Sequence, residues 1–223
     1  MTEPHVHILM GTKNGGMFLA DQLASIRGQS HQDWSLWASD DGSTDGTWGA
    51  LENFKAETPH HDIHLLKGPQ SGVAANYYKL LKNQELDGRW VAFSDQDDIW
   101  LPYKLSRAVA LVGRLGGRCV YSSRSYYVDQ TGGRLGTSPM LNRPYRFGNA
   151  IVQNVLRGNT IVIPPIVTNY LRSILSTTDV AETPFHDWWT VSYTHLRAHE
   201  TLRYLVSSLQ LENKKGGGGG GGG

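Results

Sequence analysis

Cysteine is almost missing from this 223-residue chain, and the single one, Cys119, excludes an internal disulfide and a cysteine metal cage. Long apolar runs are missing too, because no segment approaches the roughly 18 apolar residues of a membrane span and no signal peptide is recognisable. The 21 basic and 20 acidic residues give a net charge of +1 without a basic block, which excludes a nucleic-acid-binding footprint. We therefore expect a cytoplasmic globular protein, at most peripheral to the inner face of a membrane.

The carboxyl end has little in common with the rest of the chain. From Val191 onward the sequence changes character, and it finishes in two lysines and an unbroken run of glycines. The stretch SYTHLRAHET resembles translated sequencing-adaptor read-through, and its His195, His199 and Glu200 do not have the HExxH spacing of a metal helix. Polyglycine does not offset the entropy of its own ordering, so we expect residues 191–223 to be a non-native, disordered tail.

Short apolar runs alternate with segments of helical periodicity over the first hundred residues. Strands are predicted at residues 6–10, 34–39, 63–66 and 90–94, with helices at 17–28, 46–55 and 73–82. This alternation predicts an α/β fold, with a Rossmann-like, mostly parallel sheet covered by helices on both faces. Ligands bind such sheets at the carboxyl ends of the strands, where the polar clusters after the first, second and fourth strands lie.

The pattern is less regular beyond Trp100. A helix is predicted at 102–115 and a strand at 119–128, then a turn at 131–133, a helix at 149–156 and a short strand at 160–163. Pro164 and Pro165 halt that last strand. We expect one domain over residues 1–190, divided into a regular half at 1–100 and an irregular half at 101–190.

Two aspartates, Asp40 and Asp41, end the second predicted strand. The following Ser43, Thr44 and Asp45 have a structural explanation, since they suit a turn and the cap of the next helix. Two adjacent carboxylates before that turn repel each other and are not expected to add to the structure. We therefore favour a ligand-binding role for the pair over a purely structural one.

A second acidic cluster, SDQDD, follows the fourth predicted strand directly. In an extended segment Asp95 and Asp97 project to one face, where two carboxylates suit Mg²⁺ or Mn²⁺. Asp98 has a structural explanation as the capping acid of the next helix. An Asp-x-Asp pair alone is common, but one at the end of the fourth strand, with a diacid upstream, is a strong indication of a metal site.

These clusters belong to longer stretches that resemble a known family. The stretches are ILMGTKNGGMFLADQLASIRGQSHQDWSLWASDDGSTDGT, GVAANYYKLL and WVAFSDQDDIWLPYKL, and they resemble the family 2 glycosyltransferases of the GT-A fold. The similarity covers residues 5–190. Ala75 and Asn76, where many members have Arg-Asn, resemble the bacterial rhamnosyltransferase-like branch. The resemblance places the nucleotide sugar on residues 1–100 and the acceptor on 101–190.

The resemblance implies an inverting, metal-dependent transferase with Mg²⁺ or Mn²⁺ as cofactor. Its donor would be a UDP- or dTDP-sugar, dTDP-rhamnose included, and its acceptor a hydroxyl of a glycan or lipid-linked acceptor in bacterial surface polysaccharide or cell-wall synthesis. The implied donor-nucleotide residues are Thr12, Asn14, Asp40, Asp41, Asn76 and Asp95. Asp97, with Asp95, would hold the metal ion. Lys13, Lys67 and Arg157 are further candidates to counter the diphosphate charge.

The second half carries the acceptor-side resemblance. RGNTIVI is similar to the Gly-x-Thr strand that lies near the sugar in the family, which implicates Gly158, Asn159 and Thr160. FHDWW is similar to the late acidic motif, which makes Asp187 the general base and places His186, Trp188 and Trp189 beside the acceptor.

Three other functions fit parts of the pattern. A sugar nucleotidyltransferase would use a similar sheet and metal, but it should have a Gly-rich, basic loop after the first strand, of which GTKNGG is a faint version. A receiver-like signalling module would use Asp40 and Asp41 to bind metal, but its phosphoacceptor should end the third strand, and residues 63–67 end without an acid. A degenerate carbohydrate-binding module is disfavoured by the base at Asp187.

Overall fold

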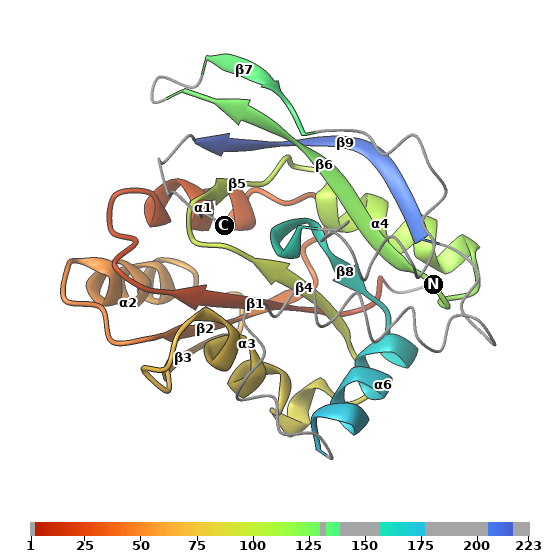
Figure 1. Ribbon diagram of the computed structural model, residues 1–223, viewed down its shortest axis with the longest axis horizontal. Helices are drawn as coiled ribbons and strands as arrows, with labels where there is room; N and C mark the ends of the chain where they lie inside the picture. Colours follow the sequence, from red (N-terminus) through yellow and green to blue (C-terminus); the bar gives the residue numbers. More distant parts are fainter. Residues whose placement is uncertain (1–2, 130–132, 139–156, 177–204, 216–223) are drawn as a thin grey trace, which may run out of the picture.

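Four parallel strands form the centre of the molecule. The computed structural model describes residues 3–129, 133–138, 157–176 and, for the backbone alone, 205–215. The strands are β1 (Val6–Thr12), β2 (Trp34–Asp40), β3 (Ile63–Lys67) and β4 (Trp90–Ser94), in the order β3-β2-β1-β4 (Figure 1). They are linked by α1 (Leu19–Arg27), α2 (Thr47–Glu57) and α3 (Val73–Leu81). Every one of these bounds lies within two residues of its predicted position.

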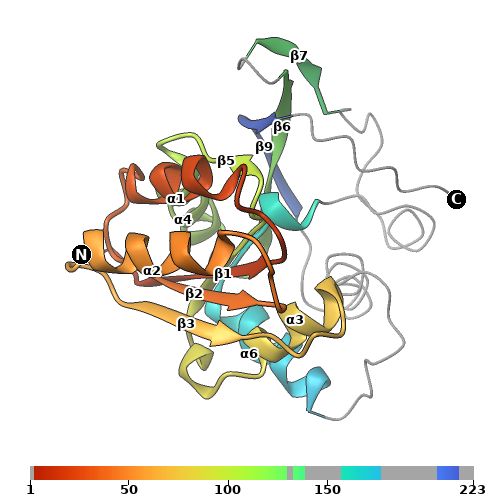
Figure 2. The ribbon, with the colours of Figure 1, turned by 90° about the vertical axis from the view of Figure 1, so that its left-hand side faces the viewer.

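Helices cover both faces of this sheet, which confirms the predicted fold class. Ile8 and Met10 of β1 face one apolar core, and Leu9 between them faces a second one, as the alternation of strand side chains requires. The first core is completed by α1, α2 and α4 (Lys104–Arg114), and the second by α3 and α6 (Pro165–Leu175). Figure 2 shows α1 on one side of the strands, and α3 and α6 on the other.

The second half extends the sheet in the antiparallel sense, so the complete sheet is mixed. β8 (Val162–Ile163) pairs with β4, and β6 (Val120–Val128) pairs with both β8 and β7 (Arg134–Thr137). The strand predicted at 160–163 is correct for its last two residues, because Gly158–Thr160 forms a 3-10 turn, η2. Pro165 opens α6, a helix that was not predicted, at a position where its missing N–H is not needed.

Strand β9 (Leu205–Lys215) differs from the disorder expected of the tail. It lies between β6, to which it is parallel, and the short β5 (Asp98–Ile99), to which it is antiparallel (Figure 1). Strand pairing uses backbone groups that every residue carries, so an unrelated sequence can occupy such an edge. The non-native origin of residues 191–223 stays a prediction. The helix predicted at 149–156 lies outside the described residues.

The membrane expectation is met only in part by the fold. Among the described residues, none of the helices combines the length and the apolar character that crossing a membrane requires. Association with a membrane surface stays a prediction.

Candidate functional site

A pocket of about 530 Å³ opens where β1, β2 and β4 end. The loops after all four parallel strands contribute to its wall, and α3 supplies the floor. The lining residues are Gly11, Thr12, Lys13, Asp41, Gln70, Gly72, Val73, Asn76, Tyr77, Asp95, Gln96 and Asp97. Five predicted site residues therefore meet in one place: Thr12, Asp41, Asn76, Asp95 and Asp97.

Asp41 is buried and fixes the loop that follows β3. Its Oδ1 accepts a hydrogen bond from the Gln70 N–H at 2.6 Å, and its Oδ2 accepts one from the Gly72 N–H at 3.0 Å. The close approach requires glycine at position 68, where a Cβ would lie 2.7 Å from Asp41 Oδ1 and 2.9 Å from Asn76 Oδ1. Asp41 thus shapes the pocket wall and is itself one of the lining residues.

Asp40 does not line the pocket. Its Oδ1 accepts hydrogen bonds from Thr12 Oγ1 at 3.0 Å and Ser43 Oγ at 2.5 Å, and its Oδ2 accepts one from the Ser43 N–H at 3.0 Å. The expectation that the Asp40–Asp41 pair adds nothing to the structure is therefore wrong. Both carboxylates are surrounded by donors, which removes the repulsion on which that expectation rested.

Lys13 and Asn14 tie the loop after β1 to the loop after β2. The Lys13 ammonium donates to the carbonyl oxygens of Asp41 at 2.7 Å and Gly42 at 2.8 Å. Asn14, with φ 48°, donates its N–H to Ser43 Oγ at 2.8 Å and accepts from the Thr44 N–H at 2.9 Å. Asn14 is thus a loop-building residue outside the pocket lining.

The other basic candidates also have partners of their own. Lys67 Nζ lies 3.1 Å from the centre of the Trp48 ring, and Arg157 donates to the Tyr127 hydroxyl. Neither lines the pocket, whose charged residues are three carboxylates and the Lys13 ammonium. The pocket is consequently acidic.

Asp95, Asp97 and Asp98 form a group able to hold a cation, since one ligand oxygen from each lies within 4.8 Å of the others. Gln96 and Asp97 form a turn, so the carboxylates converge by chain reversal and not through an extended segment as predicted. Asp98 is not a helix cap: it lies in β5, is buried, and accepts a hydrogen bond from Asn159 Nδ2. Three clustered carboxylate oxygens suit Mg²⁺ or Mn²⁺.

Tyr77 forms the floor beneath this acidic group. Its hydroxyl donates to the Ser94 carbonyl oxygen at 2.5 Å and lies 3.1 Å from Asp95 Oδ1. Burial, with a smaller contribution from Asp95, raises the pKa of Tyr77 well above 10, so the phenol keeps its proton at neutral pH. Beside it, Asn76 Nδ2 donates to the Ser39 carbonyl oxygen at 2.7 Å. Tyr77 was not predicted, because its sequence position marks it only as a buried helix residue.

The acceptor-side residues that the structure describes, Gly158, Asn159 and Thr160, do not line the pocket. Gly158, Asn159 and Thr160 are buried in η2, behind Asp98. Lys104 Nζ donates to the Asn159 carbonyl oxygen, and the Thr160 and Ser122 hydroxyls lie 2.7 Å apart. The remaining members of that prediction, His186, Asp187, Trp188 and Trp189, lie outside the described residues.

Comparison with known proteins finds similarity to glycosyltransferases. The sequence model of Glycosyl transferase family 2 matches residues 7–178. The dTDP-rhamnosyl transferase RfbG of Shigella flexneri is 30% identical over 195 residues, which are 84% of this chain and 65% of RfbG. The putative teichuronic acid biosynthesis glycosyltransferase TuaG of Bacillus subtilis is 31% identical over 125 residues, 56% of this chain and 47% of TuaG.

Solved structures share the fold at low sequence identity. Staphylococcus aureus TarS, residues 1–349, superposes with a TM-score of 0.71 at 16% identity, over 94% of this chain and 60% of that one. The mannosyltransferase PcManGT from Pyrobaculum calidifontis, solved with GDP-Man and Mn²⁺, gives a TM-score of 0.69 at 16% identity, over 96% of this chain and 57% of its own. The fold is therefore GT-A. The chain spans roughly half to two thirds of the length of these relatives.

Proposed function

Because the chain belongs to glycosyl transferase family 2, we propose that it transfers a sugar from a nucleoside-diphosphate donor to a hydroxyl acceptor in bacterial surface polysaccharide synthesis. One observation supports the proposal: a single pocket at the strand ends is lined both by members of the carboxylate cluster, Asp95 and Asp97, and by the buried Asp41. The two ends of the pocket suit the two ends of a nucleoside diphosphate.

The charge of the pocket supports metal dependence. Asp41, Asp95 and Asp97 line it, and the Lys13 ammonium already binds two backbone carbonyls. A diphosphate brought against these carboxylates would meet repulsion on the order of 4 kcal/mol for each like-charge pair at about 4 Å. Asp95 and Asp97 would hold a divalent cation, whose positive charge would offset that repulsion. PcManGT, which shares the fold, was solved with Mn²⁺ as well as GDP-Man.

The opposite end of the pocket suits a pyrimidine base. Each Asp41 oxygen accepts one backbone N–H, and a carboxylate oxygen has a second lone pair for another donor. Uracil and thymine carry an N3–H that can donate to it, whereas cytosine does not. We infer a UDP- or dTDP-sugar donor, with Thr12 and Asn76 beside the nucleoside. RfbG, named a dTDP-rhamnosyl transferase, supports dTDP-rhamnose as the first donor to test.

The proposed reaction is a single inverting displacement at the anomeric carbon. Asp95 and Asp97 hold the cation, and Asp41 fixes the base, so the donor is oriented from both ends. When bound, the divalent ion supplies positive charge against the charge that builds on the departing diphosphate. Asp187, by resemblance, accepts the proton of the acceptor hydroxyl during attack.

The receiver-like alternative is not supported by the site. β3 ends at Lys67, so the described chain offers no phosphoacceptor at that position. Family membership likewise favours transfer over nucleotidyl transfer or binding alone.

The direct test is calorimetric titration of the whole chain with UDP and with dTDP, each with and without Mn²⁺. We expect binding of at least one nucleotide that requires Mn²⁺. A folded protein that binds neither nucleotide contradicts the donor site, and binding that is equally tight in EDTA contradicts the metal dependence.

A further inference from the structure

The Tyr77 side chain reaches the acidic group from below, out of the second apolar core. Its ring is 1% exposed and meets Phe93 of β4 edge-on, with ring centroids 5.8 Å apart. The ring also lies close to β1, since a Cβ added at Gly11 would lie 3.2 Å from Tyr77 Cε2. The hydroxyl position is therefore fixed by packing.

This fixed hydroxyl contacts two successive residues. It lies 2.5 Å from the carbonyl oxygen of Ser94, the last residue of β4, and 3.1 Å from Oδ1 of Asp95, the first residue after the strand. The first contact sets where the chain leaves the sheet. The hydroxyl has a single proton, for which the Ser94 carbonyl oxygen and Asp95 Oδ1 are both acceptors, and its hydrogen bond to Oδ1 restricts rotation of the Asp95 carboxylate about the Cβ–Cγ bond.

We propose that Tyr77 is a positioning residue for the divalent-ion site, acting through the carboxylate of Asp95. This inference rests on the proposed function, because it requires that an ion binds at Asp95 and Asp97. Groups that hydrogen-bond to metal ligands typically contribute about 10–100-fold to metal affinity. Loss of the Tyr77 hydroxyl is expected to weaken Mn²⁺ binding by a factor in that range.

The competing explanation is that Tyr77 only fills the core. Phenylalanine at this position keeps the ring and its contacts with Phe93 and Gly11, and removes the oxygen alone. The next residue on α3, Tyr78, offers a matched control, since it is 4% exposed, belongs to the same core and does not line the pocket. A role in packing alone leaves metal affinity unchanged in both variants, whereas the positioning role weakens metal binding in Tyr77→Phe alone.

The experiment measures Mn²⁺ dissociation constants by electron paramagnetic resonance on the whole chain, in the presence of UDP and, separately, of dTDP. We expect Tyr77→Phe to bind Mn²⁺ about 10–100-fold more weakly and Tyr78→Phe to match the wild type. Equal affinity in a folded Tyr77→Phe overturns the inference and leaves the proposed function intact. A folded wild type that binds no Mn²⁺ overturns the inference together with the metal dependence of the proposed function, so the two failures are distinguishable.

A second measurement covers the case in which Tyr77→Phe does not fold. 3-Fluorotyrosine is incorporated at position 77 or at position 78, and the ¹⁹F resonance is followed as Mg²⁺ is added with the nucleotide that binds. We expect a saturable shift at position 77 and none at position 78. An unchanged resonance at position 77, with Mg²⁺ bound, overturns the inference.

Discussion

Gln96 and Lys13 hold each other through a reciprocal pair of hydrogen bonds. The Lys13 N–H donates to Gln96 Oε1 at 2.9 Å, and Gln96 Nε2 donates to the Lys13 carbonyl oxygen at 3.0 Å. Gln96 lies between Asp95 and Asp97, so the pair joins the acidic turn to the loop after β1. Since the Lys13 ammonium also binds the carbonyl of Asp41, one residue connects the acidic turn to the loop that carries Asp41.

Breaking this pair should loosen the pocket without unfolding the protein. Gln96→Ala removes two hydrogen bonds worth about 1 kcal/mol each, so we expect roughly a tenfold or larger loss of nucleotide affinity in the presence of Mn²⁺. Gly15→Ala should act in the same direction, because its Cβ would lie 2.2 Å from Gln96 Oε1 and displace that side chain. Calorimetric titration with the preferred nucleotide measures both variants. Wild-type affinity in both would show that the pair has no part in binding.

Asp40→Asn and Asp41→Asn should separate stability from binding. Each replacement leaves one amide NH₂ facing a donor, so we expect each to lower the free energy of unfolding by about 1–3 kcal/mol in urea denaturation. Asp41 lines the pocket and Asp40 does not. Asp41→Asn should therefore also weaken nucleotide binding, and Asp40→Asn should leave it near the wild-type value at a temperature where both are folded. Equal losses of affinity would place Asp40 in the donor site.

The parallel half of the fold could be predicted because each strand is a short apolar run bounded by polar turns. Trp90–Ser94 was predicted to the residue, since charged and turn residues border it on both sides. In the second half, the helix predicted at 102–115 and the strand predicted at 119–128 are confirmed within two residues as α4 and β6, whereas α6 was not predicted. Pro164 and Pro165 end β8 and also begin α6, and their role as strand breakers concealed the helix that follows.

The sequence was enough to predict which carboxylates belong to the site. It was not enough to predict the hydrogen bonds that hold them in place. Acidic residues at strand ends indicate ligands, and Asp41, Asp95 and Asp97 do meet in the pocket. Side-chain bonds to distant backbone groups leave no such pattern: Asp41 binds the N–H of Gln70, 29 residues away. Tyr77 was not predicted for a related reason. Its ring belongs to the core, and only its hydroxyl reaches the site.

Asp97→Asn and Asp187→Asn should impair different steps: the first metal binding, and the second sugar transfer. Asp97→Asn removes a carboxylate from the acidic group. It should weaken Mn²⁺ binding by more than the roughly 10–100-fold that is typical for loss of a group that hydrogen-bonds to a metal ligand. Asp187→Asn should keep metal-dependent nucleotide binding and lower kcat about 10²–10⁴-fold, as loss of a general base does. Calorimetry and release of nucleoside diphosphate from the sugar donor distinguish the two. Asp62→Asn, an exposed acid before β3, is the charge-matched control. Unchanged metal dependence in Asp97→Asn would contradict the metal assignment.

His7 of β1 lies near two other histidines, His5 before the strand and His64 of β3. Its Nδ1 accepts a hydrogen bond from Trp37 Nε1 at 3.1 Å, and the Ser35 hydroxyl lies 2.7 Å from the same nitrogen. Burial, followed by the nearby charges of His5, Arg89 and His64, lowers the pKa of His7 from 6.5 to about 4. His5 in turn lies 2.6 Å from a carboxylate oxygen of Asp33.

Stability should therefore fall as the solution becomes acidic. Between pH 6.5 and about 4 the unfolded chain binds a proton at residue 7 that the folded chain does not, so stability begins to drop as pH falls through 6.5 and this loss is complete below about 4. The expected loss between pH 7 and 5 is about 2 kcal/mol in urea unfolding. In His7→Asn, this part of the loss of stability between pH 7 and 5 should be absent.

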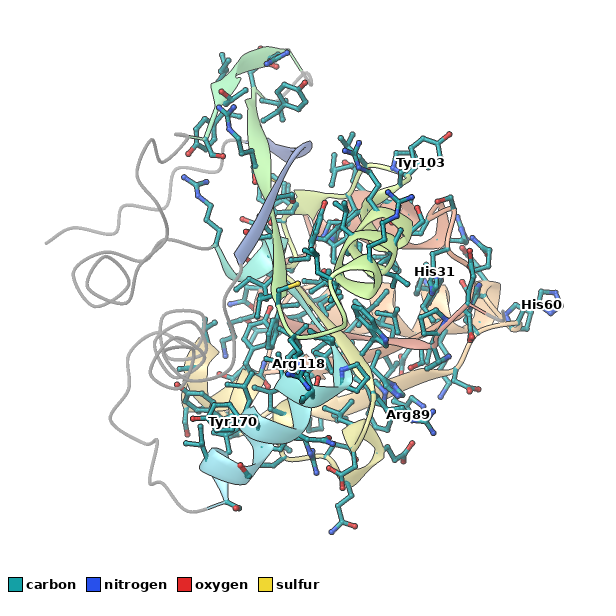
Figure 3. All side chains as sticks on the ribbon, turned by 90° about the vertical axis from the view of Figure 1, so that its right-hand side faces the viewer. His31, His60, Arg89, Tyr103, Arg118 and Tyr170 are labelled. Atoms are coloured by element: carbon teal, nitrogen blue, oxygen red, sulfur yellow. The ribbon has the colours of Figure 1, made fainter. Side chains whose placement is uncertain are left out.

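His60→Asn is the control for this pH dependence, because His60 is exposed and projects from the surface, as does Arg89 before β4 (Figure 3). It should keep the full wild-type dependence. If His7→Asn and wild type lose stability in parallel between pH 7 and 5, the acid sensitivity has another origin. A His7 resonance that titrates near 6.5 in the folded protein would lead to the same conclusion, because a pKa unchanged by folding contributes nothing to the pH dependence of stability.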